Sequence, residues 1–144
     1  SGDQPLTRRL MQAADSTWLI TTPELTAIAD AYSLVKSCAA QGPLPQIEVL
    51  VNRSESAVQA REIIERMQQT TRNFLQQEIY NAGYLPQDAS VGAALAQRQP
   101  FVIANPRSAA TQAICQLATQ WTQRTAEFPS TFTHRIAGQS RRAA

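Results

Sequence analysis

The residues best suited to chemistry in this sequence directly follow predicted strands, and all but one of them have polar side chains. They are Asn52, Arg53, Pro86, Gln87 and Asp88. An amide such as that of Asn52 offers both a donor and an acceptor, so it can read the edge of a purine. A plainer interpretation is that Asn52 only caps its strand or the helix that follows. The residues alone leave both interpretations open.

Short apolar runs that predict strands alternate with longer stripes that predict helices, and together they must position these side chains. The runs cover 18–22, 47–51 and 78–85. Strands that alternate with helices are typical of α/β proteins with a parallel sheet. Because such sheets bind ligands at the carboxyl ends of their strands, the polar residues should gather at one edge.

The expected helices follow from apolar residues at helical spacing and from the glycines and prolines that end each pattern. These helices cover 5–14, 23–41, 54–75, 88–98 and 108–121. Thr22, Ser54 and Asp88 are the expected N-caps of the second, third and fourth helices. The short apolar segment 101–103 is expected to be extended.

The expected core comes from the apolar stripes and from two cysteines. The stripe of the second helix includes Leu25, and that of the third includes Val58 and Phe74. Cys38 and Cys115 lie in apolar helical stretches and are interpreted as small core residues. Two cysteines support neither a disulfide framework nor a four-ligand zinc site.

Several classes of catalytic site find no support in the sequence. A phosphate loop of the Walker A type needs a run of glycines followed by a lysine. The chain has five scattered glycines and a single lysine, Lys36, which lies in a helical stripe. His134 is the single histidine, so a Ser-His-Asp or Cys-His set has poor support. We therefore expect no enzymatic activity from this chain alone.

The charge is close to balanced and unevenly placed. There are 13 basic and 11 acidic side chains; Arg135, Arg141 and Arg142 near the end account for three of the 13, which leaves 10 against 11. Nucleic-acid binding is not expected from such a body. No apolar stretch is long enough for a membrane span, and the first residues lack the pattern of a signal peptide, so a cytoplasmic location is expected.

Four stretches share the order and spacing of a known family. They are AADSTWLITTPELTAIADAYSLVKS at 13–37, IEVLVNR at 47–53, AGYLPQD at 82–88 and RQPFVIANPRSAATQAICQLA at 98–118. Together they resemble the C-terminal half of the MinD/ParA group of deviant-Walker P-loop ATPases. Within that group they are most similar to the flagellar-number regulators called FlhG or FleN. The TTPE and VNR motifs are specific in combination and weak separately.

The resemblance implies a role for each strand-end residue. In the family, the phosphate loop and the acids that serve magnesium lie in the N-terminal half, and the C-terminal half forms the adenine pocket. By this likeness Asn52 would recognise the base edge and Arg53 would flank it. Pro86, Gln87 and Asp88 would wall the ring from the other side, largely through their backbone.

The same resemblance implies the cofactor. The segment Asn52 to Glu55 approximates the NKxD pattern of GTPases but lacks its aspartate, so ATP or ADP with magnesium is the implied ligand of a full-length parent. Without phosphate contacts, nucleotide binding by this chain is expected to be weak or absent. The turn at 21–24, which includes Glu24, would lie near a nucleotide-dependent dimer surface.

These implications define the expected organisation and function. Residues 1–127 should form a P-loop NTPase-like, Rossmann-like three-layer half-domain that lacks the N-terminal P-loop half, and 128–144 a flexible or weakly amphipathic tail. The missing loop and the start at Ser1 are interpreted as marks of a truncated half or a degenerate relative. The expected function is the adenine-side part of a MinD-like ATPase that regulates flagellar number or placement. The alternative is an interaction module derived from such an ATPase that no longer binds nucleotide.

The expected partners follow from the same likeness. In the family, strand 18–22 lies beside a strand of the P-loop half, so here it would be an exposed apolar edge. We expect self-association through this strand or the family dimer surface, or coverage of the strand by the helix at 5–14. A flagellar regulatory protein is a further expected partner. Peripheral contact of the arginine-containing tail with the inner membrane face is a weaker expectation than a disordered end.

Overall fold

The chain forms three strands and six helices over residues 4–127, the part that the computed structural model describes. The elements are α1 (Gln4–Ala13), β1 (Ser16–Thr21), α2 (Leu25–Ala39), β2 (Gln46–Ser54), α3 (Ala57–Leu75), β3 (Ile79–Pro86), α4 (Ala89–Ala96), α5 (Phe101–Ala104) and α6 (Ala109–Glu127). The predicted tail, 128–144, lies outside the described residues.

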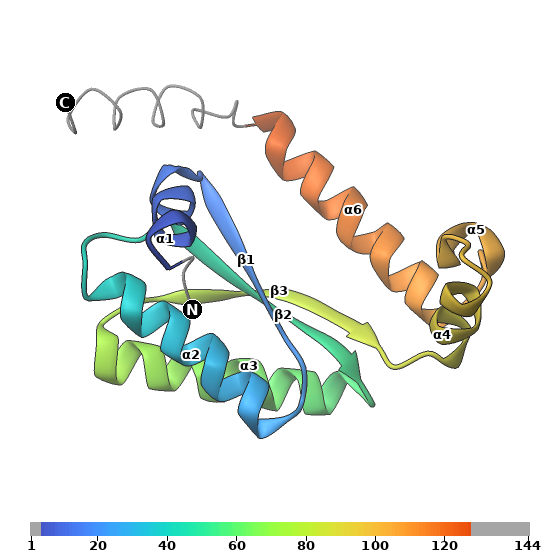
Figure 1. The fold of residues 1–144 in the computed structure, drawn as a ribbon, viewed down its shortest axis with the longest axis horizontal. Coiled ribbons are helices and arrows are strands. Elements are labelled where there is room, and N and C mark those ends of the chain that lie inside the picture. Colours follow the sequence, from blue (N-terminus) through green and yellow to red (C-terminus); the bar gives the residue numbers. More distant parts are fainter. Residues whose placement is uncertain (1–3, 128–144) are drawn as a thin grey trace.

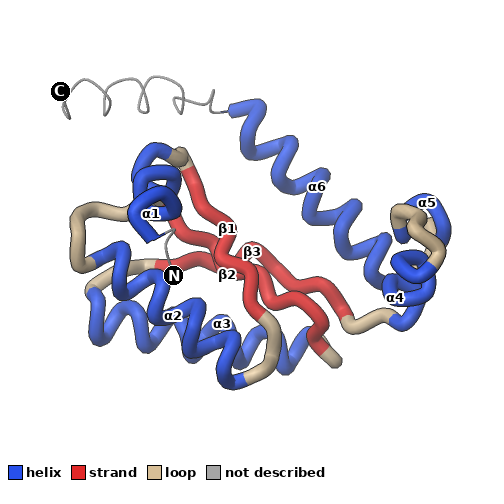
Figure 2. Tube along the Cα trace, viewed as in Figure 1, coloured by secondary structure: helices blue, strands red, loops and turns tan. Residues whose placement is uncertain are grey.

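The three strands form one parallel sheet in the order β1-β2-β3. Helices α2 and α3 cover one face of this sheet, and α6 crosses the other face (Figures 1 and 2). The predicted α/β class with a parallel sheet in a three-layer arrangement is therefore confirmed. In this arrangement the carboxyl ends of the strands open at one edge, beside the first turns of α2 and α3.

The core lies between the sheet and the α2–α3 layer. The middle strand contributes Ile47, Val49 and Val51, all fully buried, and the helices contribute Val35 and Ile64. Alternate residues of β2 point to this side because side chains alternate across a strand. Glu48 points to the other side and is also buried, where the Gln46 amide donates a hydrogen bond of 3.2 Å to its carboxylate. A strand buried on both faces is typical of the centre of a parallel sheet.

The α6 layer is held by a few large contacts. Trp18 of β1 packs edge-on against Trp121 of α6, with ring centroids 5.1 Å apart and an interplanar angle of 81°. About one helical turn before Trp121, Leu117 of α6 faces Gly83 of β3, which has a φ of +116° and whose added Cβ would lie 3.1 Å from Leu117. The backbone angle therefore favours glycine at this position, and any larger residue would also require the Leu117 side chain to shift slightly.

Two predicted helix caps were wrong. The N-cap of α2 is Glu24, which makes no side-chain capping bond, and that of α3 is Ser56, whose hydroxyl accepts a 3.1 Å hydrogen bond from the Gln59 amide. Ser54, the predicted cap, is the last residue of β2. Its hydroxyl donates to Ser56 O and to Gln59 Oε1, so it supports the turn from the strand side.

Several residues predicted for the core are exposed. On α3 the buried residues are Ala60, Ile64, Met67 and Thr71, a stripe at helical spacing. Val58 lies about 200° around the helix from Ala60, and Phe74, which is 75% exposed, comes one turn after the stripe ends. Leu25 on α2 and Cys115 on α6 are exposed as well, whereas Cys38 is buried as predicted.

The segment 101–103 was predicted to be extended and is instead the single helical turn α5. The amides of Ile103 and Ala104 both donate to the carbonyl of Pro100, at 3.0 and 3.1 Å. A short apolar run has no periodicity that separates strand from helix, so the residues of this segment alone do not decide between the two.

Candidate functional site

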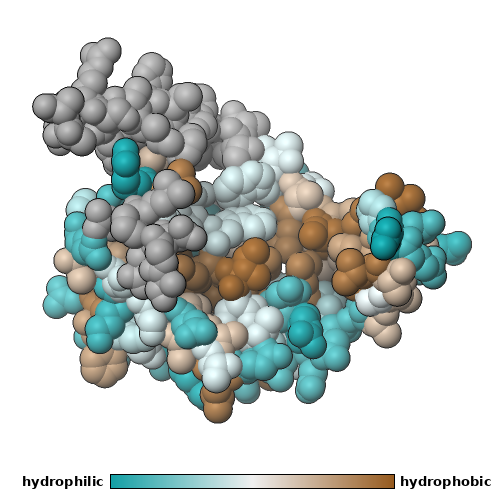
Figure 3. Space-filling model, viewed as in Figure 1, coloured by the Kyte–Doolittle hydropathy of each residue, from teal (hydrophilic) through white to brown (hydrophobic). Residues whose placement is uncertain are grey.

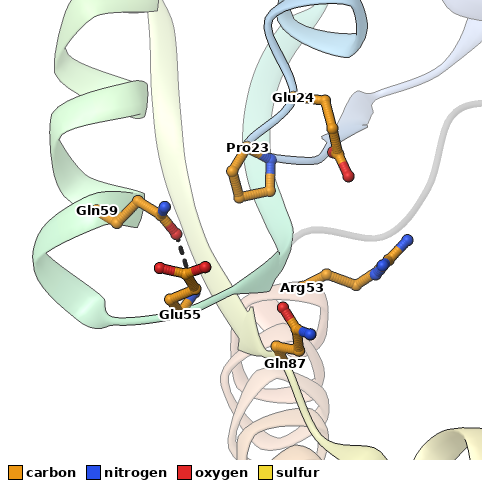
Figure 4. Close-up of a pocket in the computed structure, with 6 residues that line it drawn as sticks. All are labelled: Pro23, Glu24, Arg53, Glu55, Gln59 and Gln87. Carbon is orange, nitrogen blue, oxygen red and sulfur yellow. Dashed lines mark hydrogen bonds between the residues drawn. The ribbon is translucent and has the colours of Figure 1, made fainter.

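A pocket of about 250 Å³ opens at the carboxyl edge of the sheet (Figure 4). Its lining residues come from the turn after β1, the end of β2, the start of α3 and the end of β3. They are Pro23, Glu24, Arg53, Glu55, Gln59 and Gln87. Two of the five predicted site residues, Arg53 and Gln87, therefore meet here, together with Pro23 and Glu24 of the predicted turn.

Arg53 is held in an unusual backbone conformation. Its φ of 58° lies in the left-handed region, which residues other than glycine rarely adopt. The cause is a register shift between β2 and β3: Val51 pairs with Tyr84 and Ser54 with Pro86, so β2 has one residue more than β3 in this stretch. Strained residues of this kind gather at functional sites. The prediction had placed Arg53 after the strand, whereas it lies in the bulge within β2.

The bulge directs the Arg53 side chain into the pocket, where it lies between Glu24 and Gln87 in the view of Figure 4. Within residues 4–127 no ion pair joins this guanidinium to either nearby carboxylate. Its donors are therefore available to a ligand. The Gln87 backbone N–H donates a 2.8 Å hydrogen bond to Ser54 O, which holds this wall of the pocket against the end of β2.

Glu55 and Gln59 form the remaining wall and were missed by the sequence analysis. The Gln59 side-chain oxygen accepts a 2.9 Å hydrogen bond from the Glu55 amide (Figure 4). It also accepts a 3.0 Å hydrogen bond from the Ser54 hydroxyl. With the bond from the Gln59 amide to Ser56, these contacts resemble a capping box, except that the Gln59 side chain reaches the amide of Glu55, one residue before the N-cap. The S-x-x-Q spacing of Ser56 and Gln59 was the sequence signal for it.

Asp88 does not line this pocket and has a structural task. Its two carboxylate oxygens accept hydrogen bonds from the amides of Ser90, at 2.9 Å, and Ala110, at 3.0 Å. Asp88 therefore caps α4, as predicted, and also joins the first turn of α6. Hydrogen bonding from Ser90 and from the Ala110 backbone lowers the pKa of Asp88 from 3.8 to about 2.

Pro86 faces a different hollow. It lines a groove of about 380 Å³ between β3 and α6, together with Tyr84, Leu117 and small and glutamine side chains. The segment 86–88 is thus divided among three surroundings: the β3–α6 groove, the pocket, and the helix termini. The structure does not bring these three side chains together.

Asn52 lies in β2, one residue before Arg53, and is half-buried. It is not among the residues that line the pocket. Within the described part of the chain, its amide makes no side-chain hydrogen bond. Its role as the reader of a base edge stays a prediction.

The pocket as a whole offers one guanidinium, two amides and two carboxylates. The Gln87 amide and Arg53 suit a flat heterocycle that needs donors and acceptors in one plane. Glu24 and Glu55 would repel phosphate groups placed beside them. Over residues 4–127 there is no cluster of three or more His, Cys, Asp or Glu side chains that could hold a metal ion. No described helix combines the length and the apolar character that crossing a membrane requires.

Comparison with known proteins supports the resemblance found in the motifs. No family model matches the chain. The chain is 29% identical over 114 residues to the antiactivator FleN of Pseudomonas aeruginosa. The match covers 77% of this chain and 41% of the FleN protein, so the chain spans well under half the length of this relative. The resemblance to the FlhG and FleN regulators, and through them to the MinD/ParA group, is thereby confirmed.

Proposed function

We propose, from this likeness to part of a FleN antiactivator, that the chain supplies the adenine side of the nucleotide site of a MinD-like ATPase. In this proposal the ATPase regulates flagellar number or placement, and ATP or ADP with magnesium is the ligand of the complete protein. The chain alone binds the base weakly and performs no hydrolysis. Its expected location is the cytoplasm, with the tail 128–144 as a weaker candidate for contact with the inner membrane face.

The observation that carries the proposal is the pocket where Arg53 and Gln87 meet, at the edge where parallel sheets bind ligands. The left-handed conformation of Arg53 supports it, because strain of this kind is retained where a side chain must be aimed. The Arg53 guanidinium and the Gln87 amide would contact the ring. Asn52 lies one residue earlier in β2 and outside the pocket lining, so it would have to reach the base edge from its place in the strand.

The two carboxylates of the pocket set the expected orientation of the nucleotide. Glu24 and Glu55 disfavour phosphates beside them, so the base and not the triphosphate would occupy this end. The phosphates and magnesium would then be held by residues outside this chain. Affinity for the nucleotide would rise steeply once those residues are present, since phosphate binding depends on charge-assisted hydrogen bonds.

The experiment is a titration with ATP and with ADP, followed by NMR of the side-chain amides of Asn52 and Gln87. Both amides should shift at millimolar nucleotide, and Arg53→Ala or Gln87→Ala should weaken the response severalfold. Arg61→Ala on the exposed side of α3 is the control that should leave it unchanged. If neither amide moves at millimolar nucleotide, the proposal fails for this chain.

A second candidate function is an interaction module that has lost nucleotide binding. The observation in its favour is the exposed apolar surface of α4 and α5, which the pocket does not use. The titration separates the two functions, because the module would not respond to nucleotide. A flagellar regulatory protein and a second copy of the chain are the partners that we propose under either function. Nucleic acid is not among them.

Self-association is proposed to use β1. This strand is at one edge of the sheet, and its Ile20 side chain is 59% exposed. An apolar edge strand invites pairing with another chain. Helix α1 was the alternative expected cover for this strand. It packs through Met11 onto Cys38 of α2, with the two sulfur atoms 3.7 Å apart.

A further inference from the structure

Helix α4 has an apolar character that its packing does not explain. Its sequence, ASVGAALA, contains no charged residue and a single polar one, Ser90. Only Ala94 is fully buried. The exposed residues of the helix are Ala89, Gly92, Ala93, Leu95 and Ala96. A helix that is apolar all round is normally buried all round, and residues 4–127 do not cover the exposed side of α4.

Helix α5 continues the same surface. Leu95 is 76% exposed at the end of α4, and Ile103 of α5 is 75% exposed, with Val102 beside it also exposed. The space-filling view shows apolar surface gathered at the end of the molecule that α4 and α5 form (Figure 3). We call the exposed residues of α4 with Val102 and Ile103 the α4–α5 surface. Three large aliphatic side chains so close in the chain are more than scattered surface residues.

The α4–α5 surface is accessible to a close neighbour. A Cβ built at Gly92 would meet no atom within 4 Å, so a second helix can approach the backbone of α4 there. Small residues at Ala89, Ala93 and Ala96 extend this low surface along the helix. The aliphatic side chains of Leu95, Val102 and Ile103 lie at one end of this low surface, where they could pack into a partner's apolar face.

The charged residues that follow Asp88 in this part of the sequence are all arginines, and the Asp88 carboxylate itself is engaged with the Ser90 and Ala110 amides. Arg98, in the turn between the two helices, and Arg107, after α5, are both exposed. From residue 89 to residue 126 the sequence contains no aspartate or glutamate. A partner that covers the apolar residues would therefore gain from acidic side chains at its margin. A second copy docking by the same surface would instead place arginines against arginines.

The surface is also held rigidly to the rest of the fold. The carboxylate of Asp88 joins the first turns of α4 and α6. The Thr111 hydroxyl of α6 donates a 2.8 Å hydrogen bond to the carbonyl of Asn105, just after α5. A preformed surface loses little conformational entropy when a partner binds.

We propose that the α4–α5 surface docks an acidic amphipathic helix of a partner protein. The apolar side of that helix would lie on Gly92, Leu95 and Ile103, and its acidic margin would face Arg98 and Arg107. The membrane is the weaker alternative, because two arginines fall short of the basic clusters that bind anionic lipid. This docking is separate from the nucleotide pocket and does not depend on it.

The test uses a synthetic 18-residue helix with leucines at helical spacing and glutamates elsewhere, and a matched peptide with lysines in place of the glutamates. Binding to the full chain is measured by calorimetry and mapped by NMR. The glutamate peptide should bind at least tenfold more tightly than the lysine peptide and shift the amides of α4 and α5. Leu95→Gln and Ile103→Gln should each weaken it severalfold, and Arg98→Gln should reduce its salt dependence.

Phe74→Gln is the matched control, because Phe74 is as exposed as Ile103 but lies at the end of α3. It should leave binding of the glutamate peptide unchanged. Equal binding of both peptides, no binding of either, or an equal loss in Phe74→Gln would overturn the proposal. Binding to phosphatidylglycerol vesicles that depends on Leu95 and Ile103, without binding of the peptide, would overturn it in favour of a membrane.

Discussion

Two regions of this molecule differ in how far their large apolar side chains are buried. Between the sheet and the α2–α3 layer, residues such as Ile47, Val35 and Ile64 are buried almost completely. At the carboxyl edge and around α4 and α5, large apolar side chains such as Leu95 and Ile103 face solvent, and Arg53 keeps a strained backbone. Close packing accounts for the first region. The second region has features that packing does not explain, and we propose that they serve binding.

The largest expected effect comes from the core. Ile47→Ala should lower the free energy of unfolding by about 2–5 kcal/mol, because it leaves a cavity beneath two helices. Leu95→Ala, at the exposed end, should change it by less than about 0.5 kcal/mol. Urea denaturation of both variants measures the difference. Comparable losses of unfolding free energy in the two variants would show that Leu95 is packed, and the difference in burial between the two regions would no longer hold.

The edge of the sheet gives the next effect. Ile20→Lys should weaken self-association about tenfold, because a charge on an edge strand opposes pairing. Leu25→Lys is the control, since Leu25 is also an exposed apolar residue but lies on α2. Sedimentation over a range of concentrations measures the association. A clean monomer of the unaltered chain, with freely exchanging amides in β1, would contradict the proposed pairing.

A smaller effect is expected from Asp88, which ties the exposed end to the core. Because its folded-state pKa is lowered to about 2, it stabilises the fold above pH 4 and loses this contribution as the pH falls from about 4 to about 2. Asp88→Asn should therefore lower stability at pH 6 and flatten its dependence on pH between 4 and 2. Chemical denaturation at several pH values tests this. Parallel pH curves for the two proteins would contradict the assignment.

The smallest expected change in the free energy of unfolding is at Arg53, and it tests whether this residue serves binding or packing. Arg53→Gly should leave the free energy of unfolding unchanged or raise it by up to about 1 kcal/mol, because glycine tolerates the left-handed backbone. The same change should weaken the nucleotide response proposed for the pocket. Val51→Gly, two residues earlier in regular strand, should destabilise the protein instead. A clear loss of stability in Arg53→Gly would mean that the side chain serves packing.

Much of the fold could be predicted because it depends on strong local patterns. The apolar runs of β1, β2 and β3 and the alternation with helices led directly to a parallel α/β sheet. The cap at Asp88 was also readable from residue type and position. The errors fell where a local pattern allowed two outcomes. Phe101 to Ile103 reads equally well as strand or helix, and only the backbone after Pro100 settles it.

The site was predictable only in part, for a related reason. Sequence reasoning placed Arg53 and Gln87 at the same edge, and the structure brings them into one pocket. It could not foresee the bulge that turns Arg53 into that pocket, because a bulge depends on the pairing of two strands. Glu55 and Gln59 were missed, although Ser56 and Gln59 have the spacing of a capping box. The roles of all five residues in nucleotide binding stay predictions, those of Arg53 and Gln87 included.

The register of β2 and β3 has a consequence for changes in chain length. Between Val49 and Leu50 the partner strand advances from Asn81 to Gly83, and between Val51 and Ser54 it advances only from Tyr84 to Pro86. The two offsets cancel, so both strands finish level. Deleting a residue from either strand alone would displace one rim of the pocket by a residue. Deleting the extra residue of β2 together with the extra residue of β3 would restore the alignment. Relatives should therefore gain or lose these two extra residues together.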